Sequence, residues 1–179
     1  MLTIPFYKMV PTIAAIALLL TGCGLTQTVT DGTVAASQSL FHKRVKTLHL
    51  DFIPRAAVNT DTGESVALSV PALVRVYQLR DNNAIKKVDY ADLLDDGDHI
   101  LSADCLASEE VVVKPGSHAS LDMPMAAQAK YVAVVGLFRN PDLANGTWRR
   151  IIKRNQLLAD GPRIIELNAH GLALLPEKG

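Results

Sequence analysis

Residues 69–79 read Ser-Val-Pro-Ala-Leu-Val-Arg-Val-Tyr-Gln-Leu, and this stretch decides the fold class. Apolar side chains recur at every second position from Leu68 to Val76, which is the period of a strand with one buried face. Pro71 stands near the start of the strand. Because proline has no amide hydrogen to offer a neighbouring strand, it predicts an edge position or a bulge. The stretch therefore predicts one long strand of a β-sheet.

Similar segments lie on both sides of this strand. Upstream, apolar and polar residues alternate over residues 45–52, which predicts a half-buried strand. Downstream, residues 131–138 are apolar without interruption, as in a central strand that is covered on both faces. Residues 148–153 fit a strand or a helix. The remaining predicted strands are 111–113, 119–123, 163–167 and 172–175. Seven or eight short strands separated by turns predict an all-β fold, an antiparallel two-sheet β-sandwich.

An acidic segment, residues 80–98, interrupts the strand pattern. Asp89 is placed to cap a short helix that runs through Leu94, with Asp92 near its positive end. The run Asp95-Asp96-Gly97-Asp98 suggests calcium, but Leu94 occupies a ligand position and no Glu follows at the twelfth place of the loop template. We therefore predict a short helical insertion here rather than a calcium site.

The amino terminus is organised like a secretory signal peptide. Lys8 precedes an apolar run from Val10 to Leu20, about half of the ~20 residues that a membrane-spanning helix needs. The run ends in Leu20-Thr21-Gly22-Cys23, which resembles the lipobox of bacterial lipoproteins; the alternative is an ordinary signal peptide with a chance cysteine. The resemblance implies a diacylglycerol on the Cys23 thiol and an N-acyl chain, such as palmitate, on its amine. Gly24 replaces the Asp that commonly retains such proteins in the inner membrane, which implies an outer-membrane position facing the periplasm.

Composition and length set further limits. The 179 residues carry 18 Lys and Arg against 18 Asp and Glu, and this neutrality argues against a nucleic-acid partner, which needs a clustered basic surface. We expect a signal peptide over residues 1–22, the lipidated Cys23 with a flexible tether over 23–44, and one β-sandwich domain over 45–179. With Cys23 lipidated, Cys105 has no partner for an internal disulfide, and we expect a buried, unreactive thiol.

Motifs of catalysis and metal binding are missing from the sequence. No Gly-rich phosphate loop and no nucleophile elbow occurs. The histidines share no metal-ligand spacing; they are His42, His49, His99, His118 and His170. Trp148, followed by a cationic patch at residues 149–154, fits a core residue beside solvated cations better than an interface. We therefore expect no enzyme, no metal, no cofactor besides the covalent lipid and no small-molecule substrate.

Taken in order, these features resemble the TssJ (SciN-like) lipoproteins of the bacterial type VI secretion system. The order is a lipobox, a polar tether, a first strand, a long loop and the strand at residues 69–79. The agreement continues through residues 90–95, Val113-Lys114-Pro115-Gly116, the run at 131–139 and Trp148-Arg149. It covers nearly the whole mature chain.

The resemblance implies a transthyretin-like β-sandwich that is anchored in the outer membrane. It also implies a partner, the periplasmic domain of an IcmF-like inner-membrane protein (TssM), bound through the loop between the first two strands. The implied partner-binding residues are Ala57, Val58, Asn59, Thr60, Asp61, Thr62, Gly63, Glu64 and Ser65. Exposed polar loops held by rigid strands often carry recognition, although these residues alone fit a solvated connection equally well.

Two other functions compete with this tether. A pilot lipoprotein that escorts an outer-membrane protein would share the anchor and differ only in its partner. A transthyretin-like hydrolase would use clustered His and Arg residues and a Tyr-Arg-Gly-Ser tail. This chain instead ends in Leu175-Pro176-Glu177-Lys178-Gly179, which argues against the hydrolase.

Overall fold

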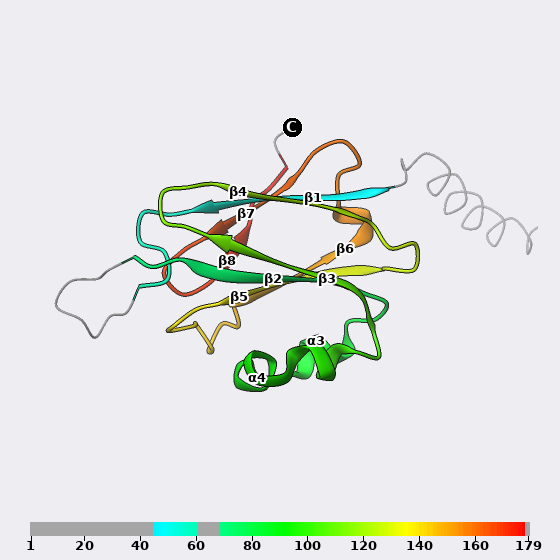
Figure 1. The fold of residues 1–179 in the computed structure, drawn as a ribbon, viewed down its shortest axis with the longest axis horizontal. Coiled ribbons are helices and arrows are strands. Elements are labelled where there is room, and N and C mark those ends of the chain that lie inside the picture. The colour runs from blue at the N-terminus through cyan, green and yellow to red at the C-terminus, as the bar shows by residue number, and fades with distance from the viewer. Residues whose placement is uncertain (1–44, 61–68, 178–179) are drawn as a thin grey trace, which may run out of the picture. The chain divides into compact units, whose positions relative to one another are not determined.

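The structure is a computed structural model that describes residues 45–60 and 69–177. Within this part of the chain, eight strands form two sheets of four strands each, which appear as two layers in Figure 1. The strands are β1 (Thr47–Pro54), β2 (Ala72–Leu79), β3 (Cys105–Val113), β4 (Ala119–Pro124), β5 (Tyr131–Leu137), β6 (Arg149–Lys153), β7 (Arg163–Leu167) and β8 (Leu172–Leu174). The predicted β-sandwich is confirmed.

The first sheet has the strand order β4-β1-β7-β8, and the second has the order β3-β2-β5-β6. All neighbouring strands run antiparallel except β1 and β7, which pair in parallel with Leu50 opposite Arg163. A parallel pair needs a long crossover, and here the whole second sheet is formed by the chain between the two strands. The sequence had predicted a wholly antiparallel sandwich. The parallel pairing of β1 with β7 corrects this detail.

The core lies between the two sheets. Leu48, Leu50 and Phe52 point inward from β1 and are fully buried, as the alternation in residues 45–52 predicted. Gln78 of β2 is a polar member of this core, and it is also fully buried. Its amide nitrogen donates to the Pro124 carbonyl at 2.9 Å, and its amide oxygen accepts from the Ala126 backbone nitrogen at 2.7 Å. Both groups of the buried amide are thus satisfied.

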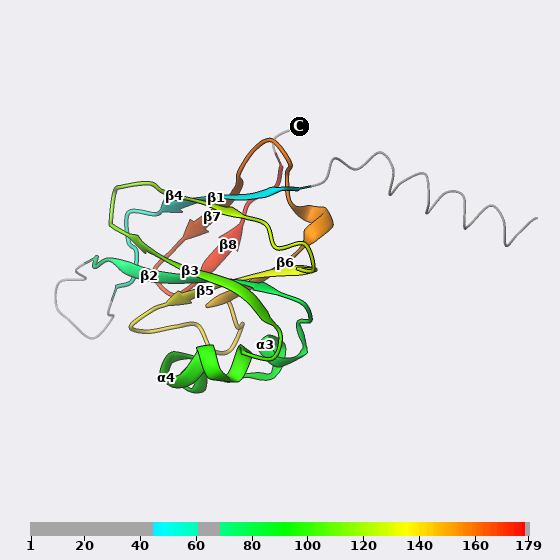
Figure 2. The same ribbon diagram turned by 45° about the vertical axis from the view of Figure 1, so that its right-hand side comes forward.

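Two helices cover the outer face of the second sheet (Figures 1 and 2). They are α3 (Asn83–Lys87) and α4 (Tyr90–Leu101). Residues 132–136 of β5 are buried on both faces, so the prediction of a covered central strand is confirmed. At Gly97 of α4, an added Cβ would lie 3.3 Å from the Tyr77 hydroxyl of β2. The glycine therefore allows the helix to approach the sheet closely.

Several local predictions need correction or completion. The strand expected at residues 111–113 is longer and begins at Cys105. Pro71 marks neither an edge nor a bulge, because β2 begins one residue later and lies between β3 and β5. Residues 95–98 belong to α4, which has non-helical dihedral angles at Asp96 and extends past the predicted end at Leu94. The helix α3 had not been predicted. The segment at 148–153 is the strand β6 and is followed by the 3₁₀ helix η2 (Arg154–Gln156).

The eight residues of β1 separate two ends of the sandwich by roughly 25 Å. We call the end where β1 begins the tether end, because the sequence continues from Val45 back toward Cys23; it includes residues 45–46, 125–131 and 153–155. We call the end where β1 finishes the loop end. It includes residues 55–60, 69–71, 139–148 and 168–171, which the strand pairings bring to one side of the sandwich.

Candidate functional site

The loop between β1 and β2 leaves the sheet through a stem that is bonded to its neighbours. The Arg55 amide donates to the Leu167 carbonyl at 2.8 Å, and its guanidinium forms an ion pair with Glu166 at 2.7 Å. On the return side, the Ser69 hydroxyl donates to the Ala56 carbonyl at 2.9 Å. The two sides of the loop are therefore fastened to each other and to β7.

Asn59 is the centre of this stem. It is 3% exposed, and its φ of 48° lies in the left-handed region that Asn tolerates better than most residues. Its side-chain nitrogen donates to the Pro71 carbonyl at 2.9 Å, and its side-chain oxygen accepts from the Arg139 backbone amide at 2.8 Å. One side chain thus joins both sides of the loop to the end of β5.

The implied partner-binding residues divide into two groups. Ala57 is exposed, whereas Val58, Asn59 and Thr60 are buried, so the expected exposure is wrong for these three. Val58 belongs to the apolar core, and the side-chain amide of Asn59 is hydrogen-bonded within the stem. Residues 61–65 lie outside the described residues, as does the implied lipidation site Cys23. The sequence could have indicated the stem at Asn59, because Asn in a turn-rich stretch often adopts a positive φ.

Two further loops are fastened to the stem at the loop end. The backbone amide of Asn59 donates to the Asn168 carbonyl at 3.4 Å. The ring nitrogen Nδ1 of His170 lies 2.7 Å from the Asn140 carbonyl oxygen. In the β5–β6 loop, the carboxylate of Asp142 accepts hydrogen bonds from the backbone amide of Asn145 and from its side chain. The backbone bond is the larger of the two causes that lower the pKa of Asp142. The loop end is therefore one connected surface rather than a set of separate loops.

Leu143 lies in the β5–β6 loop and is 62% exposed, which makes it an apolar point on this surface. Near it, Trp148 is 3% exposed, so the interpretation of Trp148 as a core residue is confirmed. Arg149 is not the solvated cation that the sequence had suggested. Its guanidinium carbon lies 4.5 Å from the centre of the Trp148 ring, and it donates to backbone carbonyls of α3 and its C-terminal cap at Ile85 (2.6 Å), Lys86 (2.8 Å) and Val88 (2.8 Å). A cation at the negative end of a helix is favourable.

A polar cluster lies between the second sheet and α4. It surrounds a cavity of about 330 Å³, where Arg75 pairs with Glu110 at 2.6 Å and Tyr77 donates to Asp98 at 3.3 Å. Burial, followed by the charge of Asp98, raises the pKa of Tyr77 to about 12, so the hydroxyl stays protonated. No histidine lines the cavity within the described chain. The cluster holds α4 on the sheet, and the raised pKa of Tyr77 makes its hydroxyl a weak nucleophile.

Other residues of interest also have structural surroundings. Among the described residues, no group of three or more His, Cys, Asp or Glu could hold a metal ion. Cys105 is half-buried, and burial raises the pKa of its thiol, which disfavours the reactive thiolate. Over residues 45–60 and 69–177, no helix is both long and apolar enough to cross a membrane.

This β-sandwich with helices on one sheet matches a known class of protein. A family model described as type VI secretion lipoprotein (VasD, EvfM, TssJ) matches residues 46–170. The chain therefore belongs to the type VI secretion lipoprotein family, and the resemblance found in the sequence is confirmed. None of the curated proteins matches the chain significantly.

Solved structures agree with this assignment. A chain of a structure described as "Type VI membrane complex" is 38% identical, with a TM-score of 0.68, and the match covers 74% of this chain and 99% of that chain. A chain of "T6SS protein TssM C-terminal domain (869-1107) from EAEC" is 36% identical with a TM-score of 0.67, over 74% of this chain and 100% of that chain. Serratia marcescens Lip, described as a membrane-bound component of the type VI secretion system, has the same fold at 22% identity and a TM-score of 0.64, over 75% of this chain and 100% of that chain.

Proposed function

We propose that this protein is the lipid-anchored, non-enzymatic tether of a type VI secretion membrane complex. Lipid chains on Cys23 hold it in the outer membrane, facing the periplasm, and the loop between β1 and β2 binds the periplasmic domain of a TssM-like protein. Family membership supports the lipoprotein assignment, and two related chains come from structures named for TssM and for the membrane complex.

One observation carries the choice of the loop. Its stem is built into the loop end by Asn59, about the length of β1 away from Val45, where the sequence leads toward the anchor. A loop at that position is presented on the side of the domain opposite its attachment to the tether. Because the stem is fixed by buried bonds, little conformational entropy of these residues remains to be lost on binding. Within the implied set, we assign the contacts to Ala57 and residues 61–65, since Val58, Asn59 and Thr60 are buried.

The test is the affinity of residues 24–179 for the periplasmic domain of the cognate TssM-like protein, measured by biolayer interferometry. In the key variant, residues 61–65 are replaced by an equally long Gly and Ser sequence, so that Asn59 and the stem remain. We expect binding to be lost while the thermal unfolding temperature stays unchanged.

A matched control changes the neighbouring β3–β4 hairpin at the same end. Lys114, Ser117 and His118 are exposed there and are replaced by Ser or Gly, with Pro115 and Gly116 kept for the turn. This control should bind like the wild type. Binding lost in the hairpin variant instead would move the site along the loop end. No binding by the wild type would favour a pilot-type lipoprotein with another partner.

A further inference from the structure

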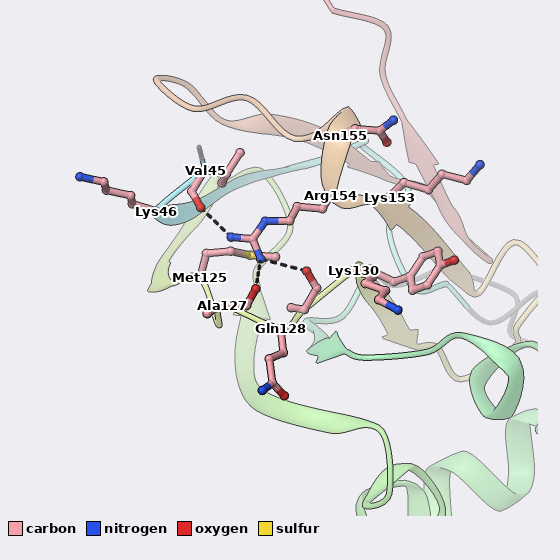
Figure 3. A pocket seen from close by; sticks show the side chains of 11 residues that line it. Val45, Lys46, Met125, Ala127, Gln128, Lys130, Lys153, Arg154 and Asn155 are labelled. Atoms are coloured by element: carbon pink, nitrogen blue, oxygen red, sulfur yellow. Dashed lines mark hydrogen bonds between the residues drawn. The ribbon is translucent and has the colours of Figure 1, made fainter. Parts of the chain in front are cut away.

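A basic hollow of about 760 Å³ opens at the tether end, on the opposite side of the sandwich from the proposed partner loop (Figure 3). It is lined by three segments that are distant in sequence: residues 45–46 just before β1, the β4–β5 connection with the first residue of β5, and the end of β6 with η2. Its charged side chains are Lys46, Lys130, Lys153 and Arg154. None of the described residues that line it is acidic. Asp81 and Asp104, which lie near the ends of β2 and β3, do not line the hollow.

Arg154 builds the floor of this hollow. Its guanidinium donates to the carbonyls of Ala126 (2.8 Å), Ala127 (3.1 Å), Ala129 (2.9 Å) and Val45 (3.0 Å), as Figure 3 shows in part. These bonds join the first described residue to the β4–β5 connection. The guanidinium of Arg154 is therefore occupied by hydrogen bonds within the protein. The charges available to a ligand are those of the lysines.

The three lysines form the rim. All three are exposed, and none forms an ion pair with a carboxylate of the described residues. In Figure 3, Lys46 and Lys153 extend to opposite sides of the hollow, and Lys130 extends from a third position. Such spread charges fit an extended anionic surface better than one small anion, for which the cations would have to converge.

We propose that this lysine rim contacts the headgroups of anionic phospholipids in the membrane that carries the lipid anchor. The rim lies beside Val45, where the described chain begins. Residues 24–44 separate it from Cys23, and a segment of this length cannot reach farther than about 70 Å. The anchor thus keeps the rim at high effective concentration near the membrane surface, where a weak electrostatic contact suffices. The proposal rests on the lipoprotein family and not on the partner loop.

The contact has a consequence for orientation. With the lysine rim on the membrane, the length of β1 points the loop end away from the lipid, roughly 25 Å farther out. The partner loop would then be presented toward the periplasm instead of sampling all directions on a tether.

The test uses residues 24–179 without the lipid. This part folds on its own, because it contains the whole compact unit from Arg44 to Gly179 and because 74% of the chain aligns with 99% of a solved relative. Flotation is measured with vesicles of phosphatidylglycerol and phosphatidylcholine in equal parts and with vesicles of phosphatidylcholine alone, at low ionic strength. We expect binding to the anionic vesicles only.

The variant Lys46→Gln, Lys130→Gln, Lys153→Gln removes the rim. Its control, Lys86→Gln, Lys87→Gln, Lys114→Gln, removes three exposed lysines from α3 and the β3–β4 hairpin and has the same net charge. Each basic residue near an anionic membrane strengthens binding by about fivefold, so the rim variant should bind on the order of a hundredfold more weakly. The control should lose far less.

Three results would overturn the proposal. Equal losses in both variants would mean a general charge effect without a defined surface, and failure of the wild type to float with anionic vesicles would exclude the contact. Release by inorganic phosphate well beyond that by chloride at equal ionic strength would indicate a small-anion site. Circular dichroism of both variants checks that they are folded.

Discussion

At each end of the sandwich, one buried or half-buried polar side chain joins several chain segments, and the two side chains differ in chemistry. At the loop end, the neutral amide of Asn59 donates to the Pro71 carbonyl and accepts from the Arg139 amide. At the tether end, the guanidinium of Arg154 only donates, and it does so to four carbonyls.

The difference follows from the backbone groups that each end leaves unpaired. The tether end brings several carbonyls together, and the Arg side chain offers several donors in a fixed fork. The loop end must satisfy one carbonyl and one amide, and Asn offers a donor and an acceptor together. One consequence is that Arg154 contributes a positive charge to the hollow at the tether end, whereas Asn59 contributes no charge to the stem of the loop.

The largest expected effect comes from removing the anchor. Cys23→Ser should remove the protein from the outer-membrane fraction of a density gradient, because stable attachment needs more than one acyl chain and this variant cannot take the thiol-linked ones. Folding should be unchanged. Cys105→Ser is the control and should stay in the membrane. Cys23→Ser found in the outer-membrane fraction at the wild-type level would contradict lipid anchoring.

Arg154→Met tests the tether end alone. It leaves four carbonyls without their donor, so the free energy of unfolding in urea should fall by about 3 kcal/mol. Binding of the TssM-like domain at low temperature should be unaffected, because the loop end is intact. Lys153→Met, a change of an exposed neighbour, should cost less than about 0.5 kcal/mol. Weakened partner binding in folded Arg154→Met would show that the two ends are coupled.

Asn59→Ala tests the loop end in the same way. The variant loses two buried hydrogen bonds and places Ala in a left-handed backbone conformation, which Ala adopts less readily than Asn. The free energy of unfolding should therefore fall by about 2 kcal/mol. Unlike Arg154→Met, it should also weaken partner binding, since the stem no longer positions the loop. Asn59→Gly relieves the backbone strain and loses the same bonds, so it should be less destabilised. Equal stability of the Ala and Gly variants would exclude a contribution from the backbone angle.

Tyr77 of β2, which packs against Gly97 of α4, is expected to give the smallest effect. Its pKa is raised to about 12 from an ordinary value near 10, mainly by burial. The stabilisation is complete below pH 10 and is lost as the pH rises toward 12, by about 1–2 kcal/mol, because the unfolded state then releases its proton first. In Tyr77→Phe the loss of stability over this range should be smaller, measured by urea unfolding at each pH. An unchanged pH profile would mean that another group causes the loss.

How much of this was readable in the sequence can be judged from particular residues. The alternation in residues 45–52 and 68–76 predicted two strands, although β2 begins only at Ala72, and the uninterrupted run at 131–138 predicted the covered strand. These patterns succeed because a strand's period reports directly which side chains are buried. The order of the motifs also identified the family, which the family model confirms.

The roles of the polar side chains were not readable in this way. Asn59 was assigned to an exposed loop and is buried, and Arg149 was assigned to solvent but is bound to the carbonyls of α3 and its cap. Pro71 suggested an edge strand, yet it stands just before an interior one. In each case the outcome depends on backbone groups that arrive from distant segments, and local patterns carry no information about those groups.

The sequence by itself therefore determined the strand-rich class, the buried positions along β1, β2 and β5 and the family, because these depend on local period and motif order. Only the tertiary structure decided that β1 pairs in parallel with β7 and that Lys46, Lys130 and Lys153 share one rim. It also decided which carbonyls Asn59 and Arg154 satisfy. These features arise where segments far apart in the chain are brought together, and long-range pairing leaves no period in the sequence.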